Sequence, residues 1–127
     1  MKFVRESEVP KQVFEPPYKR VIAPMITPEH QGSKNMWVAT CTYPAGYASN
    51  PHKHVNQEET FYCIAGKGQI KVDDTVVDIE VGDCVFVEPG ETHQVINFDG
   101  TEDLKLVSVV APPFTEEGFK KDHTPTS

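Results

Sequence analysis

Residues 46–66 read GYASNPHKHVNQEETFYCIAG, and residues 82–97 read GDCVFVEPGETHQVIN. Three histidines and one carboxylate stand out in these two segments: His52, His54 and Glu59 in the first, and His93 in the second. Glycine and proline interrupt both segments, which is typical of short strands joined by tight turns. Three imidazoles and a carboxylate held on such strands can bind one divalent transition metal and leave coordination positions open.

The spacing within the first segment suits a shared metal ion. Side chains alternate across a strand, so His52 and His54 face the same side, with Cβ atoms about 6–7 Å apart. Imidazoles at that separation can converge on an ion at about 2.1 Å per bond. Glu59 comes early in the next strand, and His93 follows a tight turn at Pro89-Gly90. Imidazole and carboxylate together favour Fe, Mn, Ni, Co or Zn over a thiolate-preferring ion, without selecting one of them.

Glu59 has two rivals for the carboxylate position, Gln57 and Glu58. Strand alternation places Phe61 on the inward side with Glu59 and turns Glu58 outward, although one β-bulge would reverse this assignment. A His-x-His pair alone also occurs on exposed strands. The metal hypothesis therefore depends on all four residues appearing together within the glycine and proline frames.

The chain outside these segments reads as short strands, without a sustained amphipathic helix. The expected strands cover residues 36–43, 59–65, 69–72, 75–81, 84–87, 93–98 and 104–111. Asp73-Asp74 predicts a two-residue hairpin turn, after which Val77, Ile79 and Val81 share one face. Residues 84–87 read as a short buried run. Regular short strands separated by turn residues predict an all-β sandwich or barrel.

The two ends of the chain are less regular than its middle. Residues 1–35 contain several prolines and are expected to form strands at a sheet edge or an arm on a partner subunit, with a loop at 27–34. Residues 36–113 are the expected barrel core. Residues 114–127 are polar, with Phe119 as a poor anchor, so we expect a loosely held tail. Together these segments make one domain spanning residues 1–127.

Composition limits the possible partners. A formal charge of −7, spread along the chain, argues against binding to nucleic acid or to an anionic membrane. No apolar run is long enough to span a membrane, and no secretory signal is visible, so we expect a cytoplasmic protein. Cys41, Cys63 and Cys84 are odd in number and lie in apolar runs, which indicates reduced core thiols.

The two segments resemble the two cupin motifs. Gly46, His52, His54, Glu59 and Gly66 match the first motif. Gly82, Gly90, His93 and Asn97 match the second, in which Glu88 replaces the first proline and Pro89 follows one place later. The resemblance covers about residues 36–113. It implies a double-stranded β-helix, or jelly-roll barrel, with the metal inside, and it also implies a homodimer.

Other residues are weaker candidates for the site. Four polar side chains could accept a hydrogen bond from the second ring N–H of a ligand imidazole: Gln57, Thr92, Gln94 and Asn97. Asn97 is better explained as a backbone cap at a strand end. Five side chains could line the cavity, although ordinary core is the default for each: Trp37, Cys41, Tyr43, Phe61 and Phe86. A metal ligand among Cys41, Cys63 and Cys84 is the less favoured alternative, because no Cys-x-x-Cys spacing appears. His30 and His123 lie in loop-like segments, and we assign them no role.

Two hypotheses for function come from different classes. The first is a small metalloenzyme with one divalent transition metal on His52, His54, Glu59 and His93. It would act on a small organic acid or a carbohydrate-type substrate, with dioxygenase, isomerase or lyase chemistry. The second is a non-enzymatic domain that binds or senses such a small molecule. In both, the partner is a small molecule.

Overall fold

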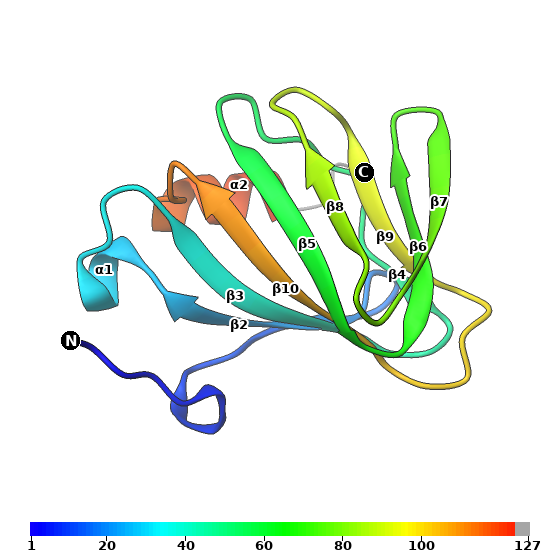
Figure 1. Ribbon diagram of the computed structural model, residues 1–127, viewed down its shortest axis with the longest axis horizontal. Coiled ribbons are helices and arrows are strands. Elements are labelled where there is room, and N and C mark those ends of the chain that lie inside the picture. The colour runs from blue at the N-terminus through cyan, green and yellow to red at the C-terminus, as the bar shows by residue number, and fades with distance from the viewer. Residues whose placement is uncertain (124–127) are drawn as a thin grey trace.

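Two antiparallel sheets carry most of the regular structure. The computed structural model describes residues 1–123. Its elements are η1 (Glu6–Glu8), β1 (Gln12–Phe14), β2 (Arg20–Ile26), α1 (Pro28–Gln31), β3 (Trp37–Tyr43), β4 (Tyr47–Ala48), β5 (Glu58–Ala65), β6 (Lys67–Val72), β7 (Thr75–Glu80), β8 (Cys84–Val87), β9 (His93–Asn97), β10 (Leu104–Ala111) and α2 (Glu116–His123). One sheet has the order β1-β2-β3-β10-β5-β8, and the other has the order β4-β9-β6-β7 (Figure 1).

The core lies between the two sheets because each strand turns every second side chain inward. Burial alternates strictly along β10, where the buried residues are Leu104, Leu106, Ser108 and Val110. Strands β3 and β9 alternate in the same way. Ile70 and Val95 of the second sheet pack in the same cluster as Leu106 of the first. This arrangement confirms the predicted all-β jelly-roll barrel.

The expected strands and hairpin are present. Each of the seven segments predicted as a strand contains one, namely β3 and β5 to β10. Val72 pairs with Thr75, which leaves Asp73-Asp74 as the two-residue turn. Asp73 has a φ of 48°, a conformation that aspartate tolerates better than most residues in a tight turn.

The N-terminal residues complete the chain's own sheet. In β2, Val21 pairs with Thr42 of β3, and β1 adds to the outer edge of β2. The first residues are also tied to the barrel, because Glu6 accepts hydrogen bonds from Thr40 and Lys105. The sequence left two alternatives for this segment, strands at a sheet edge or an arm on a partner subunit, and the structure shows strands of the chain's own sheet.

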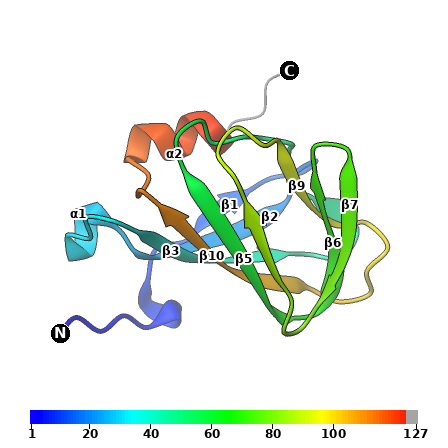
Figure 2. The ribbon, with the colours of Figure 1, turned by 45° about the horizontal axis from the view of Figure 1, so that its top comes forward.

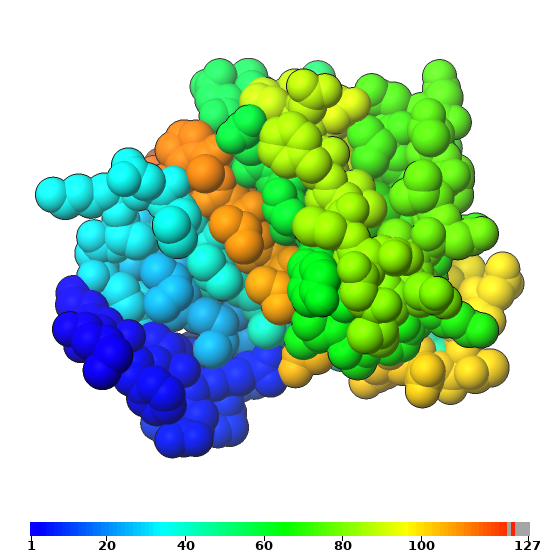
Figure 3. Space-filling model, viewed as in Figure 1, coloured from blue at the N-terminus to red at the C-terminus, as the bar shows by residue number. Residues whose placement is uncertain are grey.

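The expected burial of two segments is wrong. Of the three residues predicted to share an apolar face in β7 and after it, only Ile79 is buried, while Val77 is 41% and Val81 is 62% exposed. In β8, Cys84 is exposed and Phe86 is 55% exposed, so Cys84 is not a core thiol and Phe86 does not line the cavity. Strands β7 and β8 lie at sheet edges, and within residues 1–123 no further layer covers their outward faces (Figure 3).

The start of the expected loose tail is instead packed on the barrel. Phe114 is 2% exposed, and its ring lies 5.0 Å from that of Trp37. Helix α2 follows, and Phe119 on this helix contacts both Trp37 and Phe114. Figure 2 shows α2 lying across one end of the barrel. Phe119 and His123 are four residues apart, so they share one face of the helix, and this pairing supplies the anchor. Residues 124–127 lie outside the described part of the chain.

The expected loop at 27–34 contains a single helical turn, α1. The Thr27 side chain accepts a hydrogen bond from the His30 backbone N–H, and Gly32 ends the turn in the left-handed conformation. Within residues 1–123, neither α-helix has the length and apolar character needed to cross a membrane.

Gly66, which closes the first segment, tests how tightly the barrel is packed. Both Gly66 and Gly46 have positive φ, at 74° and 89°, but only a Cβ at Gly66 would collide with the backbone at Asp103. We expect Gly46→Ala to lower the free energy of unfolding by about 1–2 kcal/mol through backbone strain. Gly66→Ala should lower it by about 2–5 kcal/mol, because steric overlap adds to that strain. Urea denaturation of both variants measures the difference, and equal losses would contradict this packing.

Candidate metal centre

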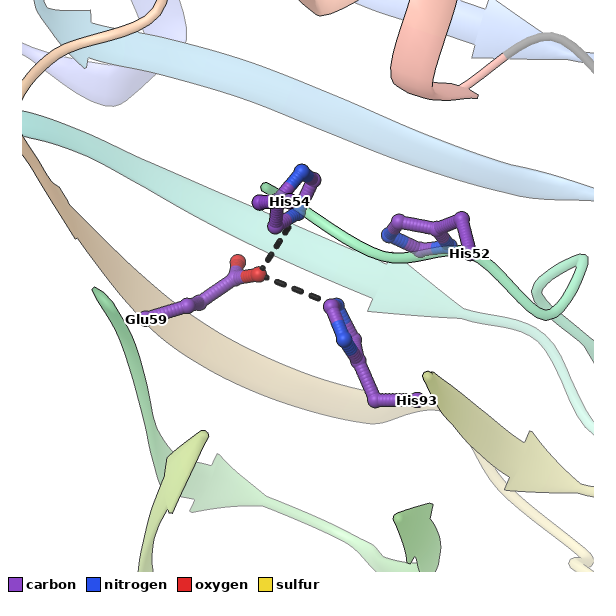
Figure 4. A group of neighbouring side chains, drawn as sticks. All are labelled: His52, His54, Glu59 and His93. Atoms are coloured by element: carbon purple, nitrogen blue, oxygen red, sulfur yellow. Dashed lines mark hydrogen bonds and ion pairs between the residues drawn. The ribbon is translucent and has the colours of Figure 1, made fainter. Parts of the chain in front are cut away.

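The four predicted residues meet inside the barrel. His52 forms an isolated bridge with His93 at the start of β9, through backbone hydrogen bonds of 3.0 and 2.8 Å. His54 lies in the loop before β5, and Glu59 is the second residue of that strand. One ligand atom from each of the four lies within 4.8 Å of the others (Figure 4). The structure therefore brings together a group that could hold a metal ion.

The two histidines of the first segment converge without sharing a regular strand. His54 lies outside the strands, so the expected strand alternation is not what orients the pair. Their ring centroids are nevertheless 5.1 Å apart, and the His52 ring is 4.4 Å from that of His93. The backbone bridge to His93, rather than a continuous strand, fixes the position of His52.

Backbone carbonyls set the tautomers of two imidazoles. His52 Nδ1 lies 2.7 Å from the carbonyl oxygen of Asn50, and His93 Nδ1 lies 3.3 Å from that of Glu91. A carbonyl oxygen only accepts hydrogen bonds, so each Nδ1 donates and each neutral ring keeps a lone pair on Nε2. This is the arrangement that metal-binding histidines generally have.

His93 Nε2 provides a direct test of whether the group suits a cation. This atom is buried and has no hydrogen-bond partner. It lies 3.1 Å from Glu59 Oε1, without the geometry of a hydrogen bond. Two acceptors held this close repel each other unless a positive charge lies beside them. A divalent cation would satisfy both atoms, so the donor set fits a metal.

Glu59 is buried and ionised. Its carboxylate Oε1 lies 3.0 Å from His54 Nε2, and Oε2 accepts a hydrogen bond of 2.6 Å from Ser108 Oγ. Burial acts to raise the pKa of Glu59, but the hydrogen bond with His54 and the electrostatic influence of the neighbouring imidazoles hold it well below 4.5. Glu59 is 5% exposed, whereas Glu58 is exposed, which confirms the inward assignment of Glu59.

Burial keeps other groups near the site uncharged. The pKa of His52 lies well below 6.5, mainly because of burial and secondly because of His93. A neutral imidazole is the form that binds a metal. Burial, with a contribution from Glu59, raises the pKa of the Cys41 thiol to about 12. A thiol that stays protonated at neutral pH is a poor ligand, so Cys41 belongs to the core.

Two of the four predicted second partners of the histidines have other roles. Asn97 donates hydrogen bonds to the backbone carbonyls of Tyr43 and Glu102, as expected for a strand cap. Gln94 donates to the carbonyl of Ser49. The hydrogen-bond partners observed for His52 and His93 are backbone carbonyl oxygens, which cannot be predicted from a pattern of side chains. Sequence reasoning also missed Ser108, since a serine in an apolar strand carries no specific signal.

His123, to which the sequence assigned no role, lies against the site. It is 6% exposed, and its ring centroid is 4.8 Å from that of His52 and 5.6 Å from that of His54. Its ring stacks on Phe119 at 4.3 Å, and its Nδ1 lies 2.8 Å from the Phe119 carbonyl oxygen. The i,i+4 spacing of two aromatic rings was the available signal. His30, by contrast, is exposed on α1.

Comparison with known proteins supports the fold and the site together. The chain matches the Cupin domain family over residues 39–110, which is more than half of its length. The protein belongs to the cupin family. All four residues of the candidate metal centre fall within the matched range.

The individual relatives described next are each less than 30% identical to this chain. The chain is 29% identical over 89 residues to an oxalate-binding protein of Thermotoga maritima, covering 70% of this chain and 73% of that protein. The crystal structure of a predicted oxalate decarboxylase from Thermotoga maritima superposes with a TM-score of 0.77 at 26% identity, covering 87% of this cupin and 98% of that chain. The polyketide cyclase RemF from Streptomyces resistomycificus has a TM-score of 0.75 at 18% identity, with 98% and 94% covered, and shares the fold.

Ser108 should tune metal affinity through Glu59. We expect Ser108→Ala to weaken metal binding by about 10- to 100-fold, because Glu59 loses the donor that orients its carboxylate. Ser49 is an equally buried serine whose hydroxyl accepts from the Val95 backbone N–H, away from the carboxylate. Ser49→Ala should therefore cost stability and leave the affinity unchanged. Competition with a chelating dye measures both affinities, and parallel losses in the two variants would contradict the assignment.

The burial of His123 predicts a pH dependence of stability in metal-free protein. Burial lowers the pKa of His123 from 6.5 to about 4. Above pH 6.5 the ring is neutral in both folded and unfolded chains, whereas between pH 6.5 and 4 only the unfolded chain takes up the proton. The free energy of unfolding should therefore fall by up to about 3 kcal/mol over this window on account of His123.

Urea denaturation followed by the fluorescence of Trp37, which contacts Phe119, measures this dependence. His123→Gln should reduce its slope between pH 6.5 and 4 and leave the part due to His52, while His30→Gln at the exposed position should leave it as in the wild type. An unchanged slope in His123→Gln would show that the ring is not buried in solution.

Proposed function

We propose that this cupin holds one divalent transition metal on His52, His54, Glu59 and His93 and uses it to act on a small organic acid. The observation that supports this most strongly is the buried His93 Nε2, which faces a charged carboxylate and lacks a hydrogen-bond partner. Within residues 1–123, this is also the group of ligand atoms close enough to share an ion. Fe, Mn, Ni, Co and Zn all suit such a donor set.

The residues of this chain prepare the centre before any ion is bound. Asn50 and Glu91 hold two imidazoles with their lone pairs inward, and Ser108 holds the carboxylate. The barrel keeps the group away from bulk water, which strengthens its electrostatic interactions. A metal bound here would supply Lewis acidity toward a carboxylate or hydroxyl group, or redox chemistry if the ion is iron.

A small organic acid is favoured over a carbohydrate by two comparisons. The relative from Thermotoga maritima is named an oxalate-binding protein, and the similar crystal structure is that of a predicted oxalate decarboxylase. The first name also supports the second hypothesis, a domain that binds such an acid without transforming it. The homodimer and the cytoplasmic location inferred from the sequence stay predictions.

Metal content tests the proposal directly. Protein purified without added metal, then loaded with each candidate ion and desalted, should hold about one ion per chain in the wild type. His52→Ala should lose nearly all of it, because one of the four donors is removed, while the barrel stays folded by circular dichroism. His30→Ala, at an exposed histidine of α1, should retain the wild-type content. Full metal content in His52→Ala would show that these residues are not the ligands.

The loaded protein then separates the two hypotheses. Incubation with oxalate, with product analysis and thermal shifts recorded on the same samples, should give turnover for an enzyme. A thermal shift without turnover of oxalate or related acids would favour a binding domain instead.

A further inference from the structure

Arg20, the first residue of β2, is a cation buried in the barrel, and the described residues place no carboxylate beside it. It is 1% exposed, and it is among the largest fully buried side chains of the protein. Among the described residues, no carboxylate oxygen lies within ion-pair distance of its guanidinium. Burying an unpaired charge costs free energy, and a protein usually offsets it with a counter-charge. This burial therefore calls for an explanation beyond packing.

The contacts of Arg20 are with neutral groups. One terminal nitrogen donates to the Tyr18 carbonyl oxygen at 2.8 Å, and the other donates to Asn50 Oδ1 at 2.8 Å. The guanidinium also lies 4.1 Å from the centre of the Phe14 ring. Each terminal nitrogen carries two N–H groups, so each keeps one beyond these bonds. A planar pair of donors of this kind matches the two oxygens of a carboxylate.

Arg20 is linked to the candidate metal centre by two routes. Asn50 accepts from Arg20 through its side chain, while its backbone carbonyl accepts from His52 Nδ1. The Phe14 ring that stacks on Arg20 lies 6.4 Å from the ring of His123, which in turn lies 4.8 Å from His52. The guanidinium and the metal centre are thus parts of one buried polar region.

The charges of this region do not balance once a metal is bound. Arg20 and Glu59 are the buried residues of the described chain that carry a charge at neutral pH, apart from the histidines, and they cancel each other. Metal-binding imidazoles are neutral. Tyr43 and Cys41 lie near Arg20, but burial raises the pKa of both, so neither supplies an anion. The two positive charges of a divalent ion would remain uncompensated in the barrel, and a dianion would neutralise them.

We propose that Arg20 is the second anchoring point for the ligand of this site, and that the ligand is a short dicarboxylate with one carboxylate at the metal centre and the other at the guanidinium. This inference rests on the proposed metal-binding function and adds the charge class of the substrate to it. Arg20 would bind and orient the ligand, while the four residues of the metal centre hold the ion.

A comparison of malonate with malonamate, in which one carboxylate is replaced by an amide, isolates the role of Arg20. Both probes are titrated by calorimetry into metal-loaded wild type, Arg20→Met, Arg20→Lys and Arg5→Met. Metal content is measured before and after each titration. Arg5 is the matched control, because its guanidinium lies on the surface in an ion pair with Glu8.

The wild type should bind malonate roughly 10- to 100-fold more tightly than malonamate, as expected for a charge-assisted pair. Arg20→Met should bring this ratio close to one with metal content unchanged, and Arg5→Met should keep it. Arg20→Lys retains the charge but loses the planar pair of donors, so it should lower the ratio of malonate to malonamate affinity. If Arg20→Met does not fold, Arg20→Lys is the variant that tests the proposal.

Three results would distinguish the possible failures. If Arg20 has only a structural role, its variants lower the melting temperature of the metal-free protein and weaken both probes equally, which overturns the inference. A wild type that holds metal but binds malonate and malonamate alike also overturns it. A wild type that takes up no metal refutes the proposed function on which the inference rests.

Discussion

The candidate site depends on one carboxylate that remains charged inside an apolar barrel. Burial alone would protonate Glu59, and a protonated carboxyl would be a weak metal ligand. His54 and His93 lie close enough to keep its pKa well below 4.5, and Ser108 donates a hydrogen bond to its second oxygen. A network that stabilises a buried negative charge also creates a site where a cation is strongly favoured.

The register between β10 and β5 places the Ser108 hydroxyl beside the Glu59 carboxylate. In the pairing of β10 with β5, Val110 lies opposite Glu59, and Ser108 lies opposite Phe61. Ser108 is therefore the diagonal neighbour of Glu59 on the inward face, within reach of a hydrogen bond. A slip of one residue would turn Ser108 outward and replace it with an apolar side chain. The hydrophobic alternation of β10, which fixes the register, thus also positions the serine that orients the carboxylate.

The sequence predicts what depends on local spacing. The strands, the Asp73-Asp74 turn and the inward position of Glu59 follow from alternation and turn chemistry, and the structure confirms them. The exposure of Phe86 was not predictable, because an apolar pattern does not reveal which strand lies at a sheet edge. The carbonyl partners of His52 and His93 are equally invisible, since every residue has a carbonyl oxygen.

Two residues near the site, Arg20 and His123, were not identified from the sequence, because they reach the site only through tertiary contacts. Nothing near Arg20 in sequence hints at burial, since its hydrogen-bond partner Asn50 is thirty residues away. His123 is brought to the site by a short helix whose anchors are Phe114 and Phe119. Patterns of strand alternation carry no information about such distant pairs.

Arg20 and His123 both lie outside the part of the chain that matches the family model, and this bears on function. The family match, residues 39–110, contains all four residues of the candidate metal centre and also Ser108. Arg20 precedes the matched range, and His123 follows it. Membership of the family therefore accounts for a group able to hold an ion, whereas Arg20, the proposed anchor for a ligand, and His123, which packs against the site, come from the flanking segments. For this reason the ligand of a relative cannot be carried over to this cupin from the shared domain alone, and the proposed role in ligand binding has to be tested at Arg20 of β2.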